Sequence, residues 1–227
     1  MTTKTRLIIL SSLLLLILGP CFGPLSRYLA SIMDLRPAAA WQVVGFIVAL
    51  AIVLGVTLAW MRRDGQTLAD LGWRKPSTRL AIILGTLVGL FWAAFGAMGY
   101  LYFDPEANLL ELSLLKLFMG VVGAVGAIME DMVTRGYLMN SLKRIKVPAW
   151  LQVVASSLLF ALYHSIWCGS LGGFIGSFVA SLVYGLILAG LFVLGKRSLT
   201  PVILAHSLAV LLAEPFLTMS LIMSVQP

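Results

Sequence analysis

The chain has 227 residues, of which 60% are hydrophobic and only 11% are charged, and its mean hydropathy is +1.02. Soluble domains carry about 25% charged residues, so this composition excludes an ordinary soluble domain and predicts a polytopic membrane protein. The net charge is +7, but the basic residues lie in short loops between apolar runs. That distribution indicates membrane topology and not a nucleic-acid-binding surface.

Seven apolar segments predict an all-α bundle of about seven transmembrane helices, forming a single membrane domain over residues 1–227. The predicted spans are 7–25, 38–61, 80–103, 112–141, 148–167, 171–195 and 200–223. The first follows two basic residues, as the apolar part of a signal peptide does. Gly19-Pro20-Cys21-Phe22 is a poor cleavage site, so we expect an uncleaved anchor.

The charges of the connecting segments alternate along the chain. The N-terminus and the segments 62–79, 143–146 and 196–197 are basic, whereas the intervening segments are acidic or nearly neutral. Because basic loops stay on the cytoplasmic side, this pattern predicts a cytoplasmic N-terminus and an external C-terminus.

The fourth apolar segment contains three charged residues within six positions: Glu130, Asp131 and Arg135. A charge at this depth costs roughly 2.5–3.5 kcal/mol on insertion scales, so such residues normally face a protein interior or a wet cavity and indicate function. Asp131 and Arg135 are four residues apart and can pair along one helix. Glu130 points about 100° away and has no such local partner. The alternative is a purely structural cluster of charges that locks helices together.

The only two histidines, His164 and His206, also lie in apolar segments. Counted from the basic ends of their helices, Glu130 lies roughly 20 Å deep, His164 roughly 24 Å and His206 roughly 14 Å. These overlapping depths predict one convergent site built from three helices. Alone, His164 could equally be a core histidine with its hydrogen bonds satisfied.

The fifth and seventh segments each place a histidine on a helix face that also carries other polar residues. On the fifth segment, Gln152, Ser156, Phe160 and His164 repeat every four residues and form a stripe that is more polar than its surroundings. On the seventh, His206, Val210 and Glu214 share one face. Glu214 precedes Pro215, which interrupts helical hydrogen bonding. We expect Glu214 to be an outer-interface charge or the partner of an arginine.

A carboxylate and an imidazole at one depth can activate water for hydrolysis. The carboxylate of Glu130 would take the proton, and His164 would position the water or stabilise developing charge. A zinc ion held by Glu130, His164 and His206 is an alternative, because two histidines and one glutamate form a known catalytic zinc set. The H-E-x-x-H spacing of many zinc proteases is absent, and we expect no metal or other cofactor.

Three motifs resemble those of the CAAX protease and bacteriocin-processing family, also called Abi. They are Glu130-Asp131-x-x-x-Arg135-Gly136-Tyr137, Phe160-x-x-x-His164, and Ser198-Leu199-Thr200-Pro201-x-x-x-x-His206-Ser207. Asp70-Leu71-Gly72-Trp73-Arg74 resembles the Leu-Gly-aromatic segment that often precedes the family's core. The resemblance implies a catalytic core over 70–212 and additional N-terminal transmembrane helices within 1–69.

The resemblance implies an intramembrane glutamate-type endopeptidase. In it Glu130 would be the catalytic base, His164 would help to hold the attacking water, and His206 would lie near the substrate carbonyl and help to stabilise the oxyanion. Asp131, Arg135 and Phe160 would support this site.

The sequence departs from the family at two positions. Asp131 replaces a glutamate and is expected to keep the pairing with Arg135. Val210 replaces the family's usual asparagine, so an oxyanion donor is expected to be missing.

The predicted function is hydrolysis of a peptide bond in a peptide or protein substrate inside or near the cell membrane, for example a CAAX-type or bacteriocin-maturation substrate. The expected partners are this substrate and the lipid bilayer, with no nucleic acid. One alternative is a weakly active or inactive member that acts as a membrane chaperone or immunity scaffold. Another is a proton-coupled transporter that uses Glu130 and His164 as a relay. Cys21 and Cys168 are too few for a disulfide framework.

Overall fold

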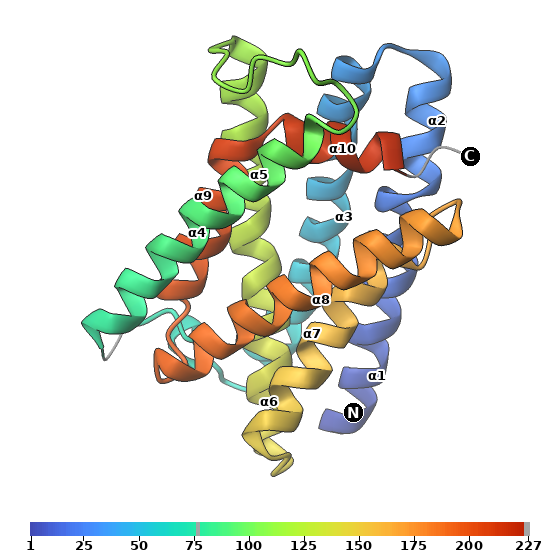
Figure 1. Cartoon of the computed structure of the whole chain (residues 1–227). Helices are drawn as coiled ribbons and strands as arrows, with labels where there is room; N and C mark the ends of the chain where they lie inside the picture. Colours follow the sequence, from blue (N-terminus) through green and yellow to red (C-terminus); the bar gives the residue numbers. More distant parts are fainter. Residues whose placement is uncertain (76–77, 225–227) are drawn as a thin grey trace.

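The computed structural model describes residues 1–75 and 78–224, and this part of the chain is helical with no strand (Figure 1). The all-α prediction is confirmed. In chain order the elements are α1 (Thr3–Leu13), η1 (Leu14–Leu18), η2 (Gly19–Phe22), α2 (Pro24–Ile32), α3 (Leu35–Arg63), η3 (Leu68–Leu71), α4 (Arg79–Tyr100), α5 (Leu114–Asp131), η4 (Met132–Leu138), α6 (Met139–Arg144), α7 (Ala149–Ser165), α8 (Leu171–Leu194), α9 (Thr200–Ala213) and α10 (Phe216–Ser224).

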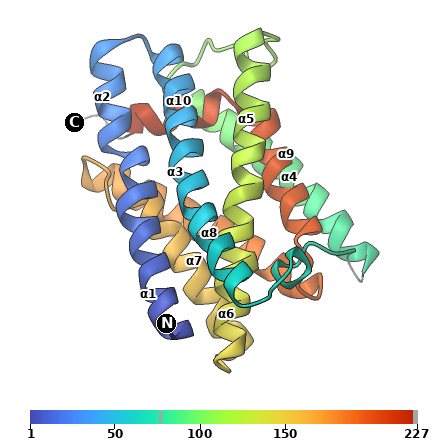
Figure 2. The same ribbon diagram turned by 180° about the vertical axis from the view of Figure 1, so that it is seen from behind.

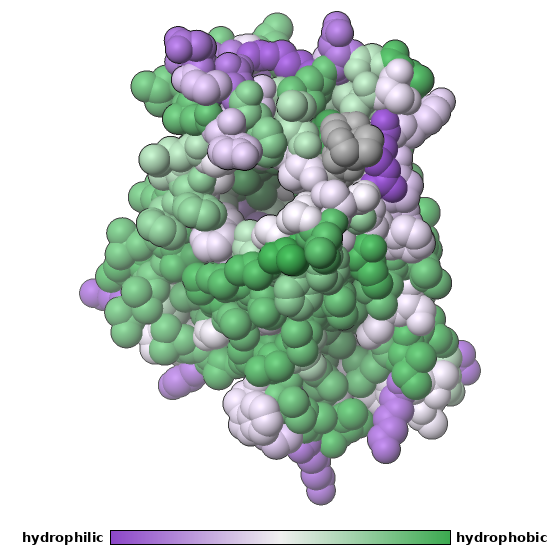
Figure 3. Space-filling view, turned by 45° about the vertical axis from the view of Figure 1, so that its right-hand side comes forward, coloured by the Kyte–Doolittle hydropathy of each residue, from purple (hydrophilic) through white to green (hydrophobic). Residues whose placement is uncertain are grey.

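Within the described residues, five helical runs are long and apolar enough to cross a membrane. They are Thr3–Ile32, Leu35–Arg63, Arg79–Tyr100, Leu114–Arg144 and Leu171–Leu194. The pair α9 and α10 counts as a sixth run if it is one broken span, and α7 is a shorter apolar helix of 17 residues. On the face shown in Figure 3, a broad band of hydrophobic residues lies between more hydrophilic ends. The protein is therefore a membrane protein, while the count of seven spans and the cytoplasmic N-terminus stay predictions.

The N-terminal run changes its helical winding where proline interrupts the hydrogen bonding. It passes from α-helix into a π turn over Leu14–Leu18 and a 3₁₀ turn over Gly19–Phe22. Pro20 has no N–H to donate back into the preceding turns. The carbonyl oxygen of Leu15 instead accepts a hydrogen bond from the indole of Trp167, at 2.8 Å. This bond ties the N-terminal run to the end of α7.

The run Leu114–Arg144 occupies the centre of the bundle and carries the three charged residues. Seen from behind, it stands next to α3, which in turn stands next to the N-terminal run (Figure 2). After Asp131 the α-helix widens into a π turn over Met132–Leu138, and nearly every side chain of that turn is buried. Such turns are rare and often lie at functional sites.

Small residues allow α4 to pack closely against α9. A Cβ atom at Gly89 would lie 2.8 Å from the carbonyl oxygen of Ala205, and one at Gly85 would collide with the carbonyl oxygen of Pro201. In a bilayer, where lipid tails are as apolar as leucine, close backbone packing of this kind is a main source of helix association. It fixes the position of α9, the helix that carries His206.

The Leu-Gly-aromatic segment anchors the start of the same helix. Gly72 has φ +97°, and a side chain there would collide with the carbonyl oxygen of Arg197. Its own carbonyl oxygen accepts a hydrogen bond from the backbone N–H of Leu199 at 2.8 Å. The hydroxyl of Ser198 donates to the carbonyl oxygen of Arg74 at 2.7 Å. Glycine is needed here because both the backbone angle and the close approach exclude a Cβ atom.

The seventh predicted segment is not one straight helix. The helix α9 ends at Ala213, and α10 begins at Phe216 with an axis bent by 80°. Pro215 lies in the break, where it can neither donate a backbone hydrogen bond nor fit inside a helix. As a result α10 lies across the bundle instead of continuing along it (Figure 1).

Candidate active site

The charged residues of the central run form a buried cluster around Asp131. Nη1 of Arg135 lies 3.1 Å from Oδ1 of Asp131, and both side chains are fully buried. The predicted pairing of these residues is present. The guanidinium of Arg135 also donates to the hydroxyl of Thr134 at 2.8 Å and lies 4.3 Å from the centre of the Phe160 ring. A flat cation stacked on an aromatic face gains attraction from the ring quadrupole, so Phe160 supports Arg135 directly.

The polar stripe of α7 faces this cluster. Gln152, Ser156 and Phe160 are buried, and the hydroxyl of Ser156 donates to the carbonyl oxygen of Thr134 at 3.0 Å. The hydroxyl of Thr134 in turn donates to the carbonyl oxygen of Glu130 at 2.8 Å. Both bonds satisfy backbone carbonyls of the central run, and the bond from Ser156 holds α7 against the widened turn.

Glu130 lies between the two histidines. Its Oε1 atom is 3.9 Å from Nε2 of His164, and its Oε2 atom is 3.8 Å from Nε2 of His206. The hydroxyl of Tyr163 donates a hydrogen bond to Oε1. Tyr163 uses one lone pair of Oε1, whereas Oε2 accepts no hydrogen bond from the described residues and can accept a further proton or hydrogen bond. The structure thus brings together the three side chains that the depth argument grouped.

Both histidines are oriented through their Nδ1 atoms. Nδ1 of His164 lies 2.8 Å from the carbonyl oxygen of Phe160, and Nδ1 of His206 lies 3.2 Å from Oδ2 of Asp131. A carbonyl and a carboxylate can only accept, so each Nδ1 carries the proton. In the neutral rings the two Nε2 atoms that point toward Glu130 are therefore hydrogen-bond acceptors.

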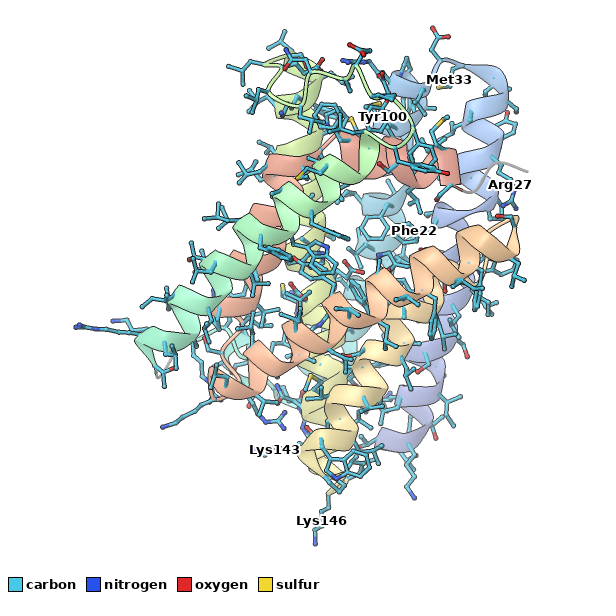
Figure 4. All side chains as sticks on the ribbon, in the orientation of Figure 1. Phe22, Arg27, Met33, Tyr100, Lys143 and Lys146 are labelled. Atoms are coloured by element: carbon cyan, nitrogen blue, oxygen red, sulfur yellow. The ribbon has the colours of Figure 1, made fainter. Side chains whose placement is uncertain are left out.

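Aromatic rings hold His164 in place. The rings of Phe22 and Phe160 lie with their centres 4.2 Å and 4.4 Å from that of His164. Phe22 comes from the N-terminal run and reaches the interior of the bundle (Figure 4). The N-terminal helices therefore contribute to the surroundings of the site.

The side chains of Glu130, His164 and His206 line a cavity of about 780 Å³. Its walls come from α3, α4, α5, α7, α8, α9 and α10, with Tyr184 of α8 and Trp92 of α4 among the large side chains. The helices α4 and α8 run at a slant across the front of the molecule, with α10 near their upper ends (Figure 1). Figure 3 shows the surface hollowed on the side that is turned forward there. Glu130 thus lies at the wall of a largely apolar cavity of the size that small ligands occupy.

Residues 111–212 match the sequence model of a family described as type II CAAX prenyl endopeptidase Rce1-like. This segment of the chain is Rce1-like. The match covers all three motifs on which the resemblance was based, and that resemblance is confirmed. No curated protein matches the chain. The similarity is to a family of membrane proteases, which agrees with the apolar helices.

The Rce1-like segment includes Val210 but ends before Glu214. Both residues line the cavity on the same side as His206. Val210 offers no hydrogen-bond donor. The expectation for Glu214, an outer-interface charge or the partner of an arginine, is wrong. Its side chain is buried at the corner between α9 and α10, where it accepts hydrogen bonds from the hydroxyl and the backbone N–H of Thr218 at 2.7 Å and 3.3 Å.

The structure also bears on metal binding and on the two cysteines. Among the described residues, no group of three His, Cys, Asp or Glu side chains is arranged to hold a metal ion. Cys21 is buried and Cys168 is partly buried, and both are free.

Tyr163 is the site residue that the sequence analysis missed. It directly precedes His164 and contacts Glu130 from α7. A tyrosine in an apolar helix is common, so its type alone gave no signal. The signal was its position: it flanks the predicted histidine, and a phenol buried in a membrane helix needs a hydrogen-bond partner.

Proposed function

We propose that this protein is a membrane-embedded endopeptidase in which Glu130 removes a proton from the water that attacks the scissile carbonyl. The observation that carries the proposal is the position of the Glu130 carboxylate, buried at the cavity wall with Nε2 atoms of two histidines within 4 Å. The Rce1-like match of the segment supports the same reaction class.

The acceptors around Glu130 suit the activation of water. Oε2 of Glu130 and Nε2 of His164 can each accept a hydrogen bond. A water molecule that donates to both keeps its lone pairs directed at the substrate carbonyl. Glu130 takes one proton, the new carbon–oxygen bond forms, and the proton passes to the leaving nitrogen as the carbon–nitrogen bond breaks.

The contact with Asp131 allows His206 to carry a positive charge during the reaction. With Nδ1 of His206 held by the Asp131 carboxylate, the ring can take up a proton from solvent at Nε2 before the water attacks and become an imidazolium stabilised by Asp131. Only in that form can Nε2 donate to the oxyanion of the tetrahedral intermediate. The Arg135 guanidinium pairs with the other oxygen of Asp131 and keeps this carboxylate oriented.

The size and lining of the cavity favour a peptide substrate within or near the cell membrane. Its volume of about 780 Å³ is that of a peptide or drug-sized site, and most of its lining side chains are apolar. CAAX-type substrates and peptides that require maturation both fit this description. No metal is needed for the proposed steps, so hydrolysis should continue in excess chelator. Inhibition by chelator that added zinc reverses would instead support the zinc alternative.

One observation favours a second candidate function. Val210 lies on the cavity wall, one helical turn after His206, at a position where the resemblance implies a donor for the oxyanion. A protein that binds peptides in this cavity without efficient hydrolysis would act as a membrane chaperone or immunity scaffold.

The test in cells compares membrane-associated peptides between a strain with the wild-type protein and one with Glu130→Ala. Glu106→Ala, which removes an exposed carboxylate outside the cavity, is the matched control. We expect uncleaved precursors to accumulate only in Glu130→Ala cells. Identical peptide profiles in all three strains, with equal amounts of protein in the membrane, would contradict proteolysis.

A further inference from the structure

A second group of polar side chains lines the cavity away from Glu130. Gln42 comes from α3, Glu214 from the corner between α9 and α10, and Thr218 and Ser220 from α10. Oε1 of Gln42 and Oγ of Ser220 are buried and have no hydrogen-bond partner. Gln42 is only 2% exposed. Burying a polar atom without a partner is costly, so these groups point to a ligand that supplies one.

Gln42 and Glu214 lie at the same level of the central helix. A Cβ atom at Gly126 of α5 would lie 3.4 Å from the ring of Phe46, one turn after Gln42 on α3. A Cβ atom at Gly123, about one turn before Gly126, would lie 3.7 Å from Cγ of Glu214. Glu130 follows Gly123 by seven positions, which corresponds to roughly 10 Å along an α-helix. The cavity therefore has two polar levels separated by this distance.

The second level offers acceptors. An ionised carboxylate has about four lone-pair sites, of which Thr218 uses two at Glu214. The amide oxygen of Gln42 is a further acceptor. The described residues that line the cavity include two glutamates and no lysine or arginine. A ligand group that fits this level donates several hydrogen bonds and carries positive charge.

We propose that Glu214 and Gln42 form a subsite for a cationic group of the substrate: a lysine or arginine side chain or a free amine. An extended peptide advances about 3.3–3.6 Å per residue, so the cationic group lies about three residues from the scissile bond. The negative charge of Glu214 disfavours a substrate that places a carboxylate in this subsite. This subsite rests on the proposed endopeptidase function and defines its substrate class.

Binding is measured first, without cleavage. The probes are dansyl-labelled octapeptides of alanine and leucine that carry one lysine or, in the reference peptide, one norleucine. The Glu130→Gln protein is assembled in phosphatidylcholine nanodiscs. We expect the lysine peptide to bind at least about tenfold more tightly than the norleucine peptide, as for a hydrogen bond to a charged group. The additional change Glu214→Gln should remove that preference, and Glu106→Gln should leave it unchanged.

Cleavage then tests the position of the subsite. The lysine is moved along the octapeptide, and mass spectrometry identifies the bond that the wild-type protein hydrolyses. We expect the cleaved bond to move with the lysine, at a separation of about three residues. In Glu214→Gln the cleaved bond should no longer follow the lysine. Gln42→Leu provides a second variant, which should reduce the preference even if Glu214→Gln does not fold.

The results separate the subsite from the proposed function. Equal binding of the lysine and norleucine peptides, or a lysine preference that survives both Glu214→Gln and Gln42→Leu, would overturn the subsite. Hydrolysis in wild type with no lysine preference would leave the endopeptidase proposal standing. Absence of hydrolysis together with a Glu214-dependent lysine preference would overturn the endopeptidase proposal and support the subsite.

Discussion

Nδ1 of His206 lies 3.2 Å from Oδ2 of Asp131, although the two residues are 75 positions apart in the chain. The same carboxylate pairs with Arg135 through its other oxygen. Asp131 therefore orients a proposed active-site histidine and neutralises a fully buried guanidinium at once.

This double contact predicts that Asp131→Asn destabilises the protein. Breaking a buried pair by removing one charge typically costs about 3–5 kcal/mol, because the remaining charge stays buried without compensation. We expect a clearly lower midpoint of thermal unfolding in nanodiscs and less folded protein in the membrane. Asp104→Asn, at an exposed position, is the control. An Asp131→Asn protein as stable as this control would show that Arg135 does not depend on Asp131.

Val210 provides a test of the oxyanion site. A single missing oxyanion donor typically costs about 10²–10³ in rate. Val210→Asn would place a donor one turn after His206 on the cavity wall. We expect kcat to increase by about tenfold or more, and Val210→Leu, which adds no donor, should give no increase. If Val210→Asn leaves kcat unchanged, a missing donor at position 210 does not limit the rate.

The pair of Arg36 and Glu111 predicts a pH dependence of stability. Nη1 of Arg36 lies 2.7 Å from Oε1 of Glu111. The hydrogen bond that Arg36 donates lowers the pKa of Glu111 below the ordinary value of 4.5. A lowered pKa in the folded state means that the pair stabilises the protein above pH 4.5, and that this contribution disappears as pH falls through the lowered pKa.

The measurement compares thermal unfolding of wild type and Glu111→Gln between pH 7 and pH 3. The pair is partly exposed, so we expect a difference below about 1 kcal/mol at pH 7 that decreases as the pH is lowered toward 3. Glu106→Gln should match wild type throughout. A difference between wild type and Glu111→Gln that grows as the pH falls would reverse the predicted sign.

The membrane orientation can be tested with single cysteines. Lys143 and Lys146 lie at the same end of the molecule as the N-terminus (Figures 1 and 4). In a protein whose native cysteines are replaced by alanine, a cysteine at position 66 should react with an impermeant maleimide only after the cells are permeabilised. A cysteine at position 108 should react in intact cells. Reaction at position 66 in intact cells would contradict the cytoplasmic assignment of this loop.

The helical character and the central site could be predicted from the sequence because each relies on a local signal. Charged residues are rare in apolar segments, so Glu130 and Arg135 were conspicuous, and the four-residue spacing predicted the pairing of Asp131 with Arg135. The depth of His164 and His206 followed from simple helix geometry. All of these features depend on helical repeat and polarity alone.

The remaining features depend on where the chain turns and what it meets in space. Pro215 indicated a break, but not that α10 would turn by 80° and bring Thr218 onto Glu214. Likewise, the bond between Tyr163 and Glu130 joins two helices whose relative rotation no periodicity determines. The surroundings of Glu214 and of Tyr163 therefore depend on a partner in another helix, which the local sequence pattern does not reveal.

The most direct test of the central claim is the hydrolysis rate of purified Glu130→Gln in nanodiscs, measured against wild type on the peptide that wild type cleaves fastest. Glutamine keeps the shape of the side chain and removes only the base. We predict a loss of at least about 10²-fold in kcat, with folded protein at the wild-type level and with Glu106→Gln fully active. Wild-type turnover by Glu130→Gln would contradict the account.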